Sequence, residues 1–186
     1  NAIVAGKPVT IGTDTSWKTS NSGLYKIGAH VWNDFGGERI DARESVPDWS
    51  RAGLDTASWR PAIPAQAPGG VVRSQPCPPN RIGKVIPAAA VTRLKDGRYE
   101  IDFGTNLTGW LRLKMPELEA GTLITMTSSD VRRGKKYQDF KQVSEFIAGG
   151  KAGEVFENKF NYAGFRYVVI KGLPSAPSKE DATALL

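Results

Sequence analysis

The stretch that decides the fold is Tyr99-Glu-Ile-Asp-Phe-Gly-Thr-Asn-Leu-Thr-Gly-Trp-Leu-Arg-Leu-Lys-Met115, which continues to Thr127. Hydrophobic and polar residues alternate in residues 99–103 and 110–115, and residues 123–127 form a third extended run. A period of two is typical of strands with one face on a core. Glycine and asparagine predict a turn at residues 104–109, and Ala120-Gly121 predicts another. The stretch therefore predicts a three-stranded meander inside an all-β sandwich.

Large aromatic side chains are the predicted core of this sandwich. The pattern predicts burial for Trp110, Phe103, Phe165 and Tyr167, and it predicts that Phe165, Tyr167 and Val169 share one face of a central strand. Trp49 and Trp59 are interpreted as further buried side chains rather than sugar-binding platforms.

Composition restricts the function classes. The 186 residues are 40% hydrophobic and carry a formal charge of +6, which suits a globular chain of about one domain with a basic surface. The dense basic run at residues 132–136 has no interleaved aromatic residues, so we expect no nucleic-acid partner. No hydrophobic run approaches the length of a membrane span, so we expect no membrane partner. No secretory signal is present in these residues.

The cysteine and histidine counts exclude several kinds of chemistry. Cys77 and His30 are the sole residues of their types, so an internal disulfide and a Cys/His metal site are both excluded. A catalytic triad would need His30 as its base, and we interpret His30 as structural. No pair of carboxylates can be assigned to glycoside hydrolysis either, so this segment is predicted to be non-catalytic.

Four motifs resemble one known family. Residues 102–110, Asp-Phe-Gly-Thr-Asn-Leu-Thr-Gly-Trp, followed by Ala-Gly-Thr at 120–122, resemble a signature of the α-L-rhamnosidases of glycoside hydrolase family 78. Residues 33–43, 47–61 and 160–172 resemble three more motifs of that family in the same order, with Ile40 in place of the usual aromatic residue. The resemblance implies a jelly-roll β-sandwich with short helical turns, placed ahead of the helical barrel that carries catalysis.

The predicted domain division follows from the same comparison. Residues 1–20 are predicted to form an N-terminal hairpin segment that a neighbouring domain can share. Residues 21–186 are predicted to form the carbohydrate-binding-like sandwich. The parent chain, if longer, is then expected to be an α-L-rhamnosidase.

The resemblance leaves two functions open. In the first, the chain is similar to carbohydrate-binding module family 67 and binds terminal L-rhamnose of a polysaccharide or glycoside through calcium, outside the cell. In the second, it is a structural accessory domain that packs against the catalytic barrel of the same parent chain. The predicted sugar-binding residues are Trp32, Asn33, Asp34 and Phe35. The predicted calcium ligands are Asn33, Asp34, Ser74, Pro78 and Pro79.

Chemistry motivates these assignments. Calcium prefers oxygen ligands from carboxylates, amides and carbonyls, and its coordination shell has room for two adjacent sugar hydroxyls. Trp32 or Phe35 would cover the apolar face of the sugar. Two interpretations stay open for the polar residues of the motif at residues 33–43. Either Glu38 or Asp41 pairs with Arg43, or oxygens near Asn33 and Asp34 hold a cation or sugar hydroxyls.

Overall fold

The computed structural model describes residues 2–67, 69–71, 73–134 and 136–186. This described part consists of strands and loops and has no helix, hence none long and hydrophobic enough to span a membrane. Near Asp55 the chain forms a tight turn, in which the Asp55 carboxylate accepts the Ala57 N–H at 2.9 Å. The strands are β1 Ala2–Val4, β2 Lys7–Val9, β3 Lys18–Thr19, β4 Leu24–Ile27, β5 Gly37–Asp41, β6 Arg60–Pro61, β7 Val85–Pro87, β8 Ala90–Arg93, β9 Tyr99–Lys114, β10 Leu123–Ser129, β11 Val131–Arg133, β12 Lys136–Gln138, β13 Val143–Ile147, β14 Val155–Glu157, β15 Ala163–Lys171 and β16 Ala182–Leu185.

The chain packs as two compact units. The first, which we call the small unit, comprises Asn1–Ser22 and Val46–Pro78, and the second, the sandwich unit, comprises Gly23–Ser45 and Pro79–Leu186. Residues 1–22 therefore belong to the same compact unit as residues 46–78. The predicted domain division at residues 20 and 21 stays a prediction.

The small unit has little core of its own. It contains the hairpin β1–β2 and the short pair β3–β6, and none of its described residues is buried. The interpretation of Trp49 as a buried side chain is wrong, because its side chain is 70% exposed. Trp59 is partly buried. Without a hydrophobic layer to enter, Trp49 has no burial to gain.

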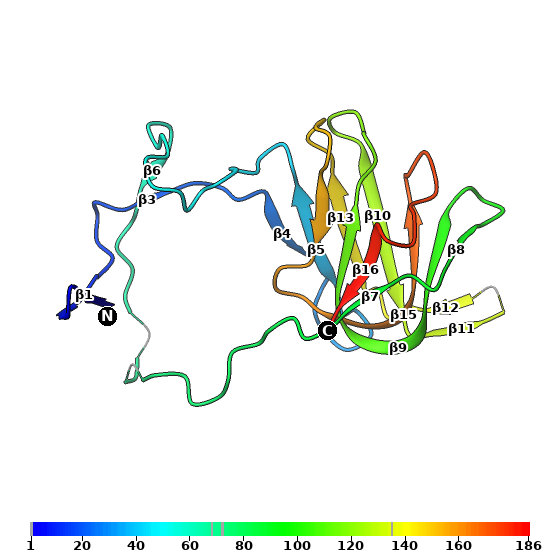
Figure 1. The fold of residues 1–186 in the computed structure, drawn as a ribbon, viewed down its shortest axis with the longest axis horizontal. Coiled ribbons are helices and arrows are strands. Elements are labelled where there is room, and N and C mark those ends of the chain that lie inside the picture. The colour runs from blue at the N-terminus through cyan, green and yellow to red at the C-terminus, as the bar shows by residue number, and fades with distance from the viewer. Residues whose placement is uncertain (1, 68, 72, 135) are drawn as a thin grey trace. The chain divides into compact units, whose positions relative to one another are not determined.

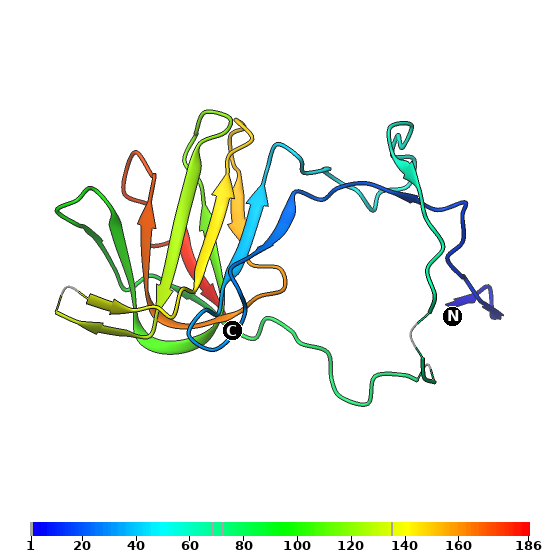
Figure 2. The ribbon, with the colours of Figure 1, turned by 180° about the vertical axis from the view of Figure 1, so that it is seen from behind.

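The sandwich unit is one continuous strand arrangement folded into two layers. The strand order is β4-β5-β13-β10-β15-β9-β16-β7, and β8 and β14 also pair with β9. The first part of β9 pairs with β8 and β15, and its last part pairs with β16 and β14. Figures 1 and 2 show β9 (green) curving through this change of layer. One long strand therefore belongs to both sheets.

The turn predicted at residues 104–109 is wrong, because these residues lie inside β9. Gly104 has φ +76 and Gly109 pairs with Ala163 of β15. A side chain at Gly109 would place its Cβ 2.3 Å from the Leu185 carbonyl oxygen. The glycines thus permit the bend and the close approach of β16 rather than a chain reversal.

The core lies between the two layers and follows the predicted alternation. Leu111, Leu113 and Met115 are all buried, as predicted. Phe103 contacts Phe165 edge to face, with ring centroids 5.5 Å apart. Trp110 is partly buried and lies outside the core cluster, because neighbours of Leu111 point to the opposite face of a pleated strand.

A register shift between β15 and β9 overturns the predicted face sharing. The register with β9 shifts between Phe165 and Tyr167. Phe165 belongs to the core cluster, whereas Tyr167 lies outside it between the guanidinium groups of Arg132 and Arg166, each 5.0 Å from its ring centre. Phe165 lies opposite the buried Leu107, but Tyr167 lies opposite Asp102, so the pairing shifts by three residues and the two side chains point to opposite sides.

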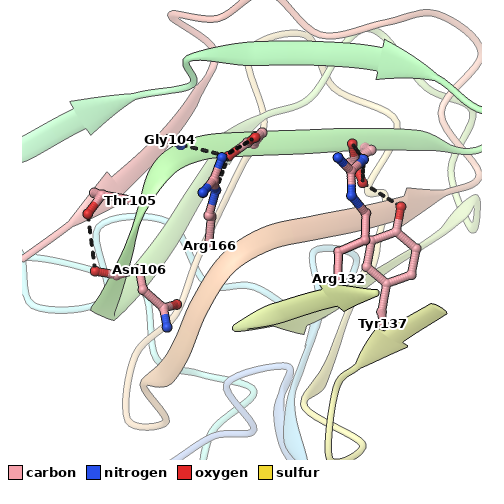
Figure 3. Close-up of polar contacts among 8 residues, drawn as sticks. Gly104, Thr105, Asn106, Arg132, Tyr137 and Arg166 are labelled. Atoms are coloured by element: carbon pink, nitrogen blue, oxygen red, sulfur yellow. Dashed lines mark hydrogen bonds and ion pairs between the residues drawn. The ribbon is translucent and has the colours of Figure 1, made fainter. Parts of the chain in front are cut away.

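The hairpin β11–β12 covers this outer face. Its Arg132 and Tyr137 both reach the carboxylate of Glu100 on β9, and Arg166 forms a two-point ion pair with Asp102, at 2.8 and 3.0 Å (Figure 3). The Glu100 side chain is only 5% exposed. A buried carboxylate with these partners fixes the hairpin to the sheet.

Candidate functional site

Two loops meet at one end of the sandwich unit. The first loop, residues 28–36, joins β4 to β5, and the second, residues 139–142, enters β13. β5 and β13 run parallel, so both loops enter the sheet at the same end. The N–H of Phe35 donates a hydrogen bond to the carbonyl of Phe140 at 3.0 Å and joins the loops. We call this region the aromatic corner.

Three aromatic rings define the corner. Trp32 contacts Phe35 edge to face at a centroid distance of 5.8 Å, and it lies 6.2 Å from Phe140. The Phe35 and Phe140 rings are 5.3 Å apart and partly buried. Trp32 is 82% exposed although two rings support it. The corner therefore offers a fixed aromatic surface to solvent.

Backbone strain is concentrated in these two loops. Six non-glycine residues in the described part of the chain have positive φ, and four of them lie here: His30, Asn33, Phe140 and Lys141. Local bonds hold them in place: Val31 and Asp34 exchange two backbone hydrogen bonds at 2.9 and 3.0 Å, and the His30 ring nitrogen lies 3.0 Å from the Ile27 carbonyl. Strained residues of this kind cluster at functional sites, which makes the corner the leading candidate.

Asp34 is the charged centre of the corner. One carboxylate oxygen accepts the Ala29 N–H at 3.2 Å, and the other lies 3.2 Å from the Lys141 ammonium. The Ala29 hydrogen bond, followed by that of Lys141, holds the pKa of the Asp34 carboxyl below its ordinary value. The Asp34 side chain is 20% exposed and that of Lys141 68%. An ionised carboxylate and an exposed ammonium therefore lie in the same two loops as Trp32, Phe35 and Phe140.

The described residues fit a calcium ion poorly. Calcium takes six to eight oxygen ligands. In the described part of the chain no group of three or more His, Cys, Asp or Glu side chains is placed to hold a metal ion. Asp34 is in contact with an ammonium, and the nearby Asp139 carboxylate accepts the Lys141 N–H at 2.9 Å.

The structure brings together some of the residues that the sequence predicts to bind sugar and calcium. Trp32, Asn33, Asp34 and Phe35 lie on one loop of the sandwich unit. Ser74 and Pro78 belong to the small unit, and Pro79 opens the second segment of the sandwich unit. Their shared calcium site with Asn33 and Asp34 stays a prediction.

Sequence reasoning missed the second loop of the corner. Phe140 and Lys141 contact Phe35 and Asp34, but 107 residues separate Lys141 from Asp34. The one available signal was an aromatic residue in an otherwise polar loop. Pairing that loop with residues 28–36 required the order of strands in the sheet.

The acidic residues Glu38 and Asp41 have structural partners, whereas a cation or sugar role for Asn33 and Asp34 stays a prediction. Arg43 pairs with Asp41 through two contacts of 2.9 and 2.6 Å. Glu38 is buried and instead accepts the backbone N–H groups of residues 159–161 at 2.6 to 2.9 Å. Both carboxylates have structural partners, and Glu38 fixes a loop that exposes Phe160 and Tyr162.

Comparison with known proteins assigns the family. Residues 92–186 match the family described as the bacterial alpha-L-rhamnosidase concanavalin-like domain, and residues 2–84 match the alpha-L-rhamnosidase N-terminal domain. The chain belongs to the α-L-rhamnosidase family. This confirms the resemblance seen in the motifs and the all-β sandwich expected from it.

Individual α-L-rhamnosidases align with most of this chain. One from Formosa agariphila is 29% identical over 94% of this chain, and one from Streptomyces avermitilis is 32% identical over 79%. The chain spans only 19% and 15% of the lengths of these relatives. It therefore corresponds to an N-terminal region of a much longer type of protein.

Solved α-L-rhamnosidase structures share the fold. The structure from Dictyoglumus thermophilum superposes with a TM-score of 0.82 at 31% identity, covering 95% of this chain and 20% of that one. The Streptomyces avermitilis enzyme complexed with L-rhamnose superposes with a TM-score of 0.73 at 30% identity, covering 81% and 15%. The Aspergillus terreus enzyme gives 0.81 at 28% identity, covering 97% and 21%.

Proposed function

We propose that this chain is a non-catalytic, carbohydrate-binding accessory region of an α-L-rhamnosidase and that its aromatic corner recognises terminal L-rhamnose. The observation that carries the proposal is Trp32, 82% exposed yet supported by Phe35 and Phe140, beside the ionised Asp34. Sugar sites combine an aromatic surface for C–H groups with a few fixed polar groups for hydroxyls. The methyl group of L-rhamnose adds apolar surface for such a ring.

The proposed ligand is a rhamnose-containing polysaccharide or glycoside. Support comes from the family, since a relative at 30% identity has been solved complexed with L-rhamnose. Calcium at this site stays a prediction from the resemblance, with Asn33 and Asp34 as its expected ligands in the sandwich unit. An extracellular location is part of the same proposal.

Calorimetry of the whole chain with L-rhamnose tests the function. We expect binding, and we expect Trp32→Ala to weaken it at least about tenfold, or about 1.4 kcal/mol. Trp49→Ala is the matched control, because Trp49 is also exposed but lies in the small unit. D-mannose, which lacks the methyl group, should bind more weakly. No binding of L-rhamnose, or equal effects of the two tryptophan variants, would remove the proposal.

Absence of catalysis is tested separately. The purified chain is expected not to release L-rhamnose from an aryl rhamnoside, because no carboxylate pair in it is assigned to hydrolysis. Turnover that is lost on substitution of one carboxylate of this chain would refute the non-catalytic assignment.

A structural role is the second candidate function. Phe160 and Tyr162 are 82% and 62% exposed on the loop that Glu38 holds, and such side chains suit contact with a catalytic domain. In a full-length parent enzyme, Phe160→Ala would then lower the melting temperature and leave L-rhamnose binding unchanged. The sugar-binding role predicts the reverse result for Trp32→Ala.

A further inference from the structure

Lys141 places a cation at the proposed sugar site, and any role of this cation in sugar binding rests on the proposed function. Hydroxyl groups of a neutral sugar compete poorly with water as hydrogen-bond partners. A site gains affinity when a fixed charge strengthens those bonds, because charge-assisted hydrogen bonds are about twice as strong as neutral ones. At the aromatic corner, the cation in contact with the Asp34 carboxylate is the Lys141 ammonium, at 3.2 Å.

We infer that Lys141 takes the place of a metal ion at the aromatic corner and that L-rhamnose binding by this chain is therefore independent of calcium. The ammonium and the carboxylate would together hold two adjacent hydroxyls of the sugar, while Trp32 covers the neighbouring C–H surface. The binding is non-covalent and involves no proton transfer.

The two charged groups have bonding capacity left for a diol. An ammonium has three N–H donors, and a carboxylate has about four acceptor positions. Asp34 accepts the Ala29 N–H and the Lys141 ammonium. One sugar hydroxyl can accept from Lys141 and the adjacent hydroxyl can donate to Asp34. The 68% exposure of the Lys141 side chain leaves the ammonium accessible to such a ligand.

The backbone of Lys141 is fixed before any ligand arrives. Lys141 has φ 55 and follows Phe140 at φ 47, an unusual pair for residues with side chains. Asp139 caps the turn, because its carboxylate accepts the Lys141 N–H at 2.9 Å and its carbonyl accepts the Gln142 N–H at 2.8 Å. The buried Gln142 amide then bonds both the N–H and the carbonyl of Gly164, each at 3.2 Å. A preorganised turn reduces the entropic cost of binding.

The contact between Lys141 and Asp34 also disfavours the binding of calcium at Asp34. A calcium ion at Asp34 would have to displace the ammonium or lie close to it, and like charges repel. The described side chains around the corner provide no acidic cluster to offset that repulsion. Lys141 already contacts the carboxylate, so no metal ion has to be stripped of its water to supply the positive charge.

Calorimetry with L-rhamnose in calcium and in chelator tests the inference on the whole chain. We expect equal affinity in both conditions, no heat from calcium chloride alone, and a loss of at least about tenfold in Lys141→Gln. Lys141→Arg keeps a cation and should retain most of the affinity. Lys151→Gln is the matched control, since Lys151 is exposed in the turn beyond the far end of β13. Circular dichroism checks that each variant is folded.

The outcomes separate the inference from the proposed function. Binding that needs calcium, or binding that Lys141→Gln leaves unchanged, overturns the inference while the sugar-binding function stands. Absence of L-rhamnose binding in both conditions removes both. Calcium-independent binding that Lys141→Gln weakens and Lys141→Arg retains supports both.

Discussion

The phenol oxygen of Tyr137 lies 2.5 Å from a carboxylate oxygen of Glu100 and donates a hydrogen bond to it. Arg132 binds the same carboxylate at 2.7 and 2.9 Å. The two partners come from opposite strands of the hairpin β11–β12, and Glu100 comes from β9 (Figure 3). A single carboxylate thus attaches the hairpin to the sheet.

Tyr137→Phe should destabilise the sandwich unit by about 1–3 kcal/mol, because it leaves a buried carboxylate with one fewer donor. Equilibrium unfolding in urea measures this change in the free energy of unfolding. Tyr162→Phe, at a 62% exposed position, should change it by less than about 0.5 kcal/mol. Equal effects of the two variants would show that the Glu100 contact contributes no stability.

Alkaline pH should weaken the attachment of the hairpin β11–β12 to Glu100. Burial first, and then the hydrogen bond to Glu100, raise the pKa of Tyr137 to about 12 from an ordinary 10.0. Below pH 10.0 the folded and unfolded chains both hold the proton, and above it the unfolded chain loses the proton first. The contribution of Tyr137 to the free energy of unfolding is therefore fully present below pH 10.0 and is lost as the pH rises to about 12.

Ultraviolet titration of tyrosinate measures that shift. The difference between the unsubstituted chain and Tyr137→Phe should contain one group that ionises about two pH units later than a free tyrosine. A difference curve centred on the ordinary tyrosine value would contradict the burial of this phenol.

Glu38→Gln should loosen the loop that carries Phe160. The carboxylate of Glu38 accepts three consecutive N–H groups, and hydrogen bonds to a charged group contribute about 1.5–3 kcal/mol. Hydrogen exchange at the amides of residues 159–161 should accelerate. Glu117→Gln, an exposed substitution in a different loop, serves as the control and should leave those rates unchanged.

Phe165→Ala should cost about 3–5 kcal/mol, since Phe165 is fully buried and packs edge to face on Phe103. Phe160→Ala is the matched control five positions away, at an 82% exposed site, and should change stability by about 0.5 kcal/mol or less. Thermal or urea unfolding distinguishes the two. Comparable losses would mean that the pairing of β15 with β9 does not place Phe165 in the core.

Local pattern predicted the layers of this fold but not the path of the chain between them. The alternation of Leu111, Leu113 and Met115 predicted their burial correctly because side chains in a strand alternate strictly between two faces. The same rule failed at Tyr167, because the pairing of β15 with β9 shifts by three residues there. It also failed at residues 104–109, where glycine accompanies a bend within β9 instead of a reversal. Glycine permits both, and the pairing partners decide between them.

For the candidate site, the sequence by itself determined which residue types stand together on one loop. Trp32, Asn33, Asp34 and Phe35 are neighbours in the chain, so their proximity required no knowledge of the fold. Only the tertiary structure decided what faces them. Lys141 lies 107 residues from Asp34 and reaches it because β13 pairs in parallel with β5, which brings both loops to one end of the sheet. Strand order depends on the packing of the whole core, whereas the identity of a residue's neighbours along one loop does not.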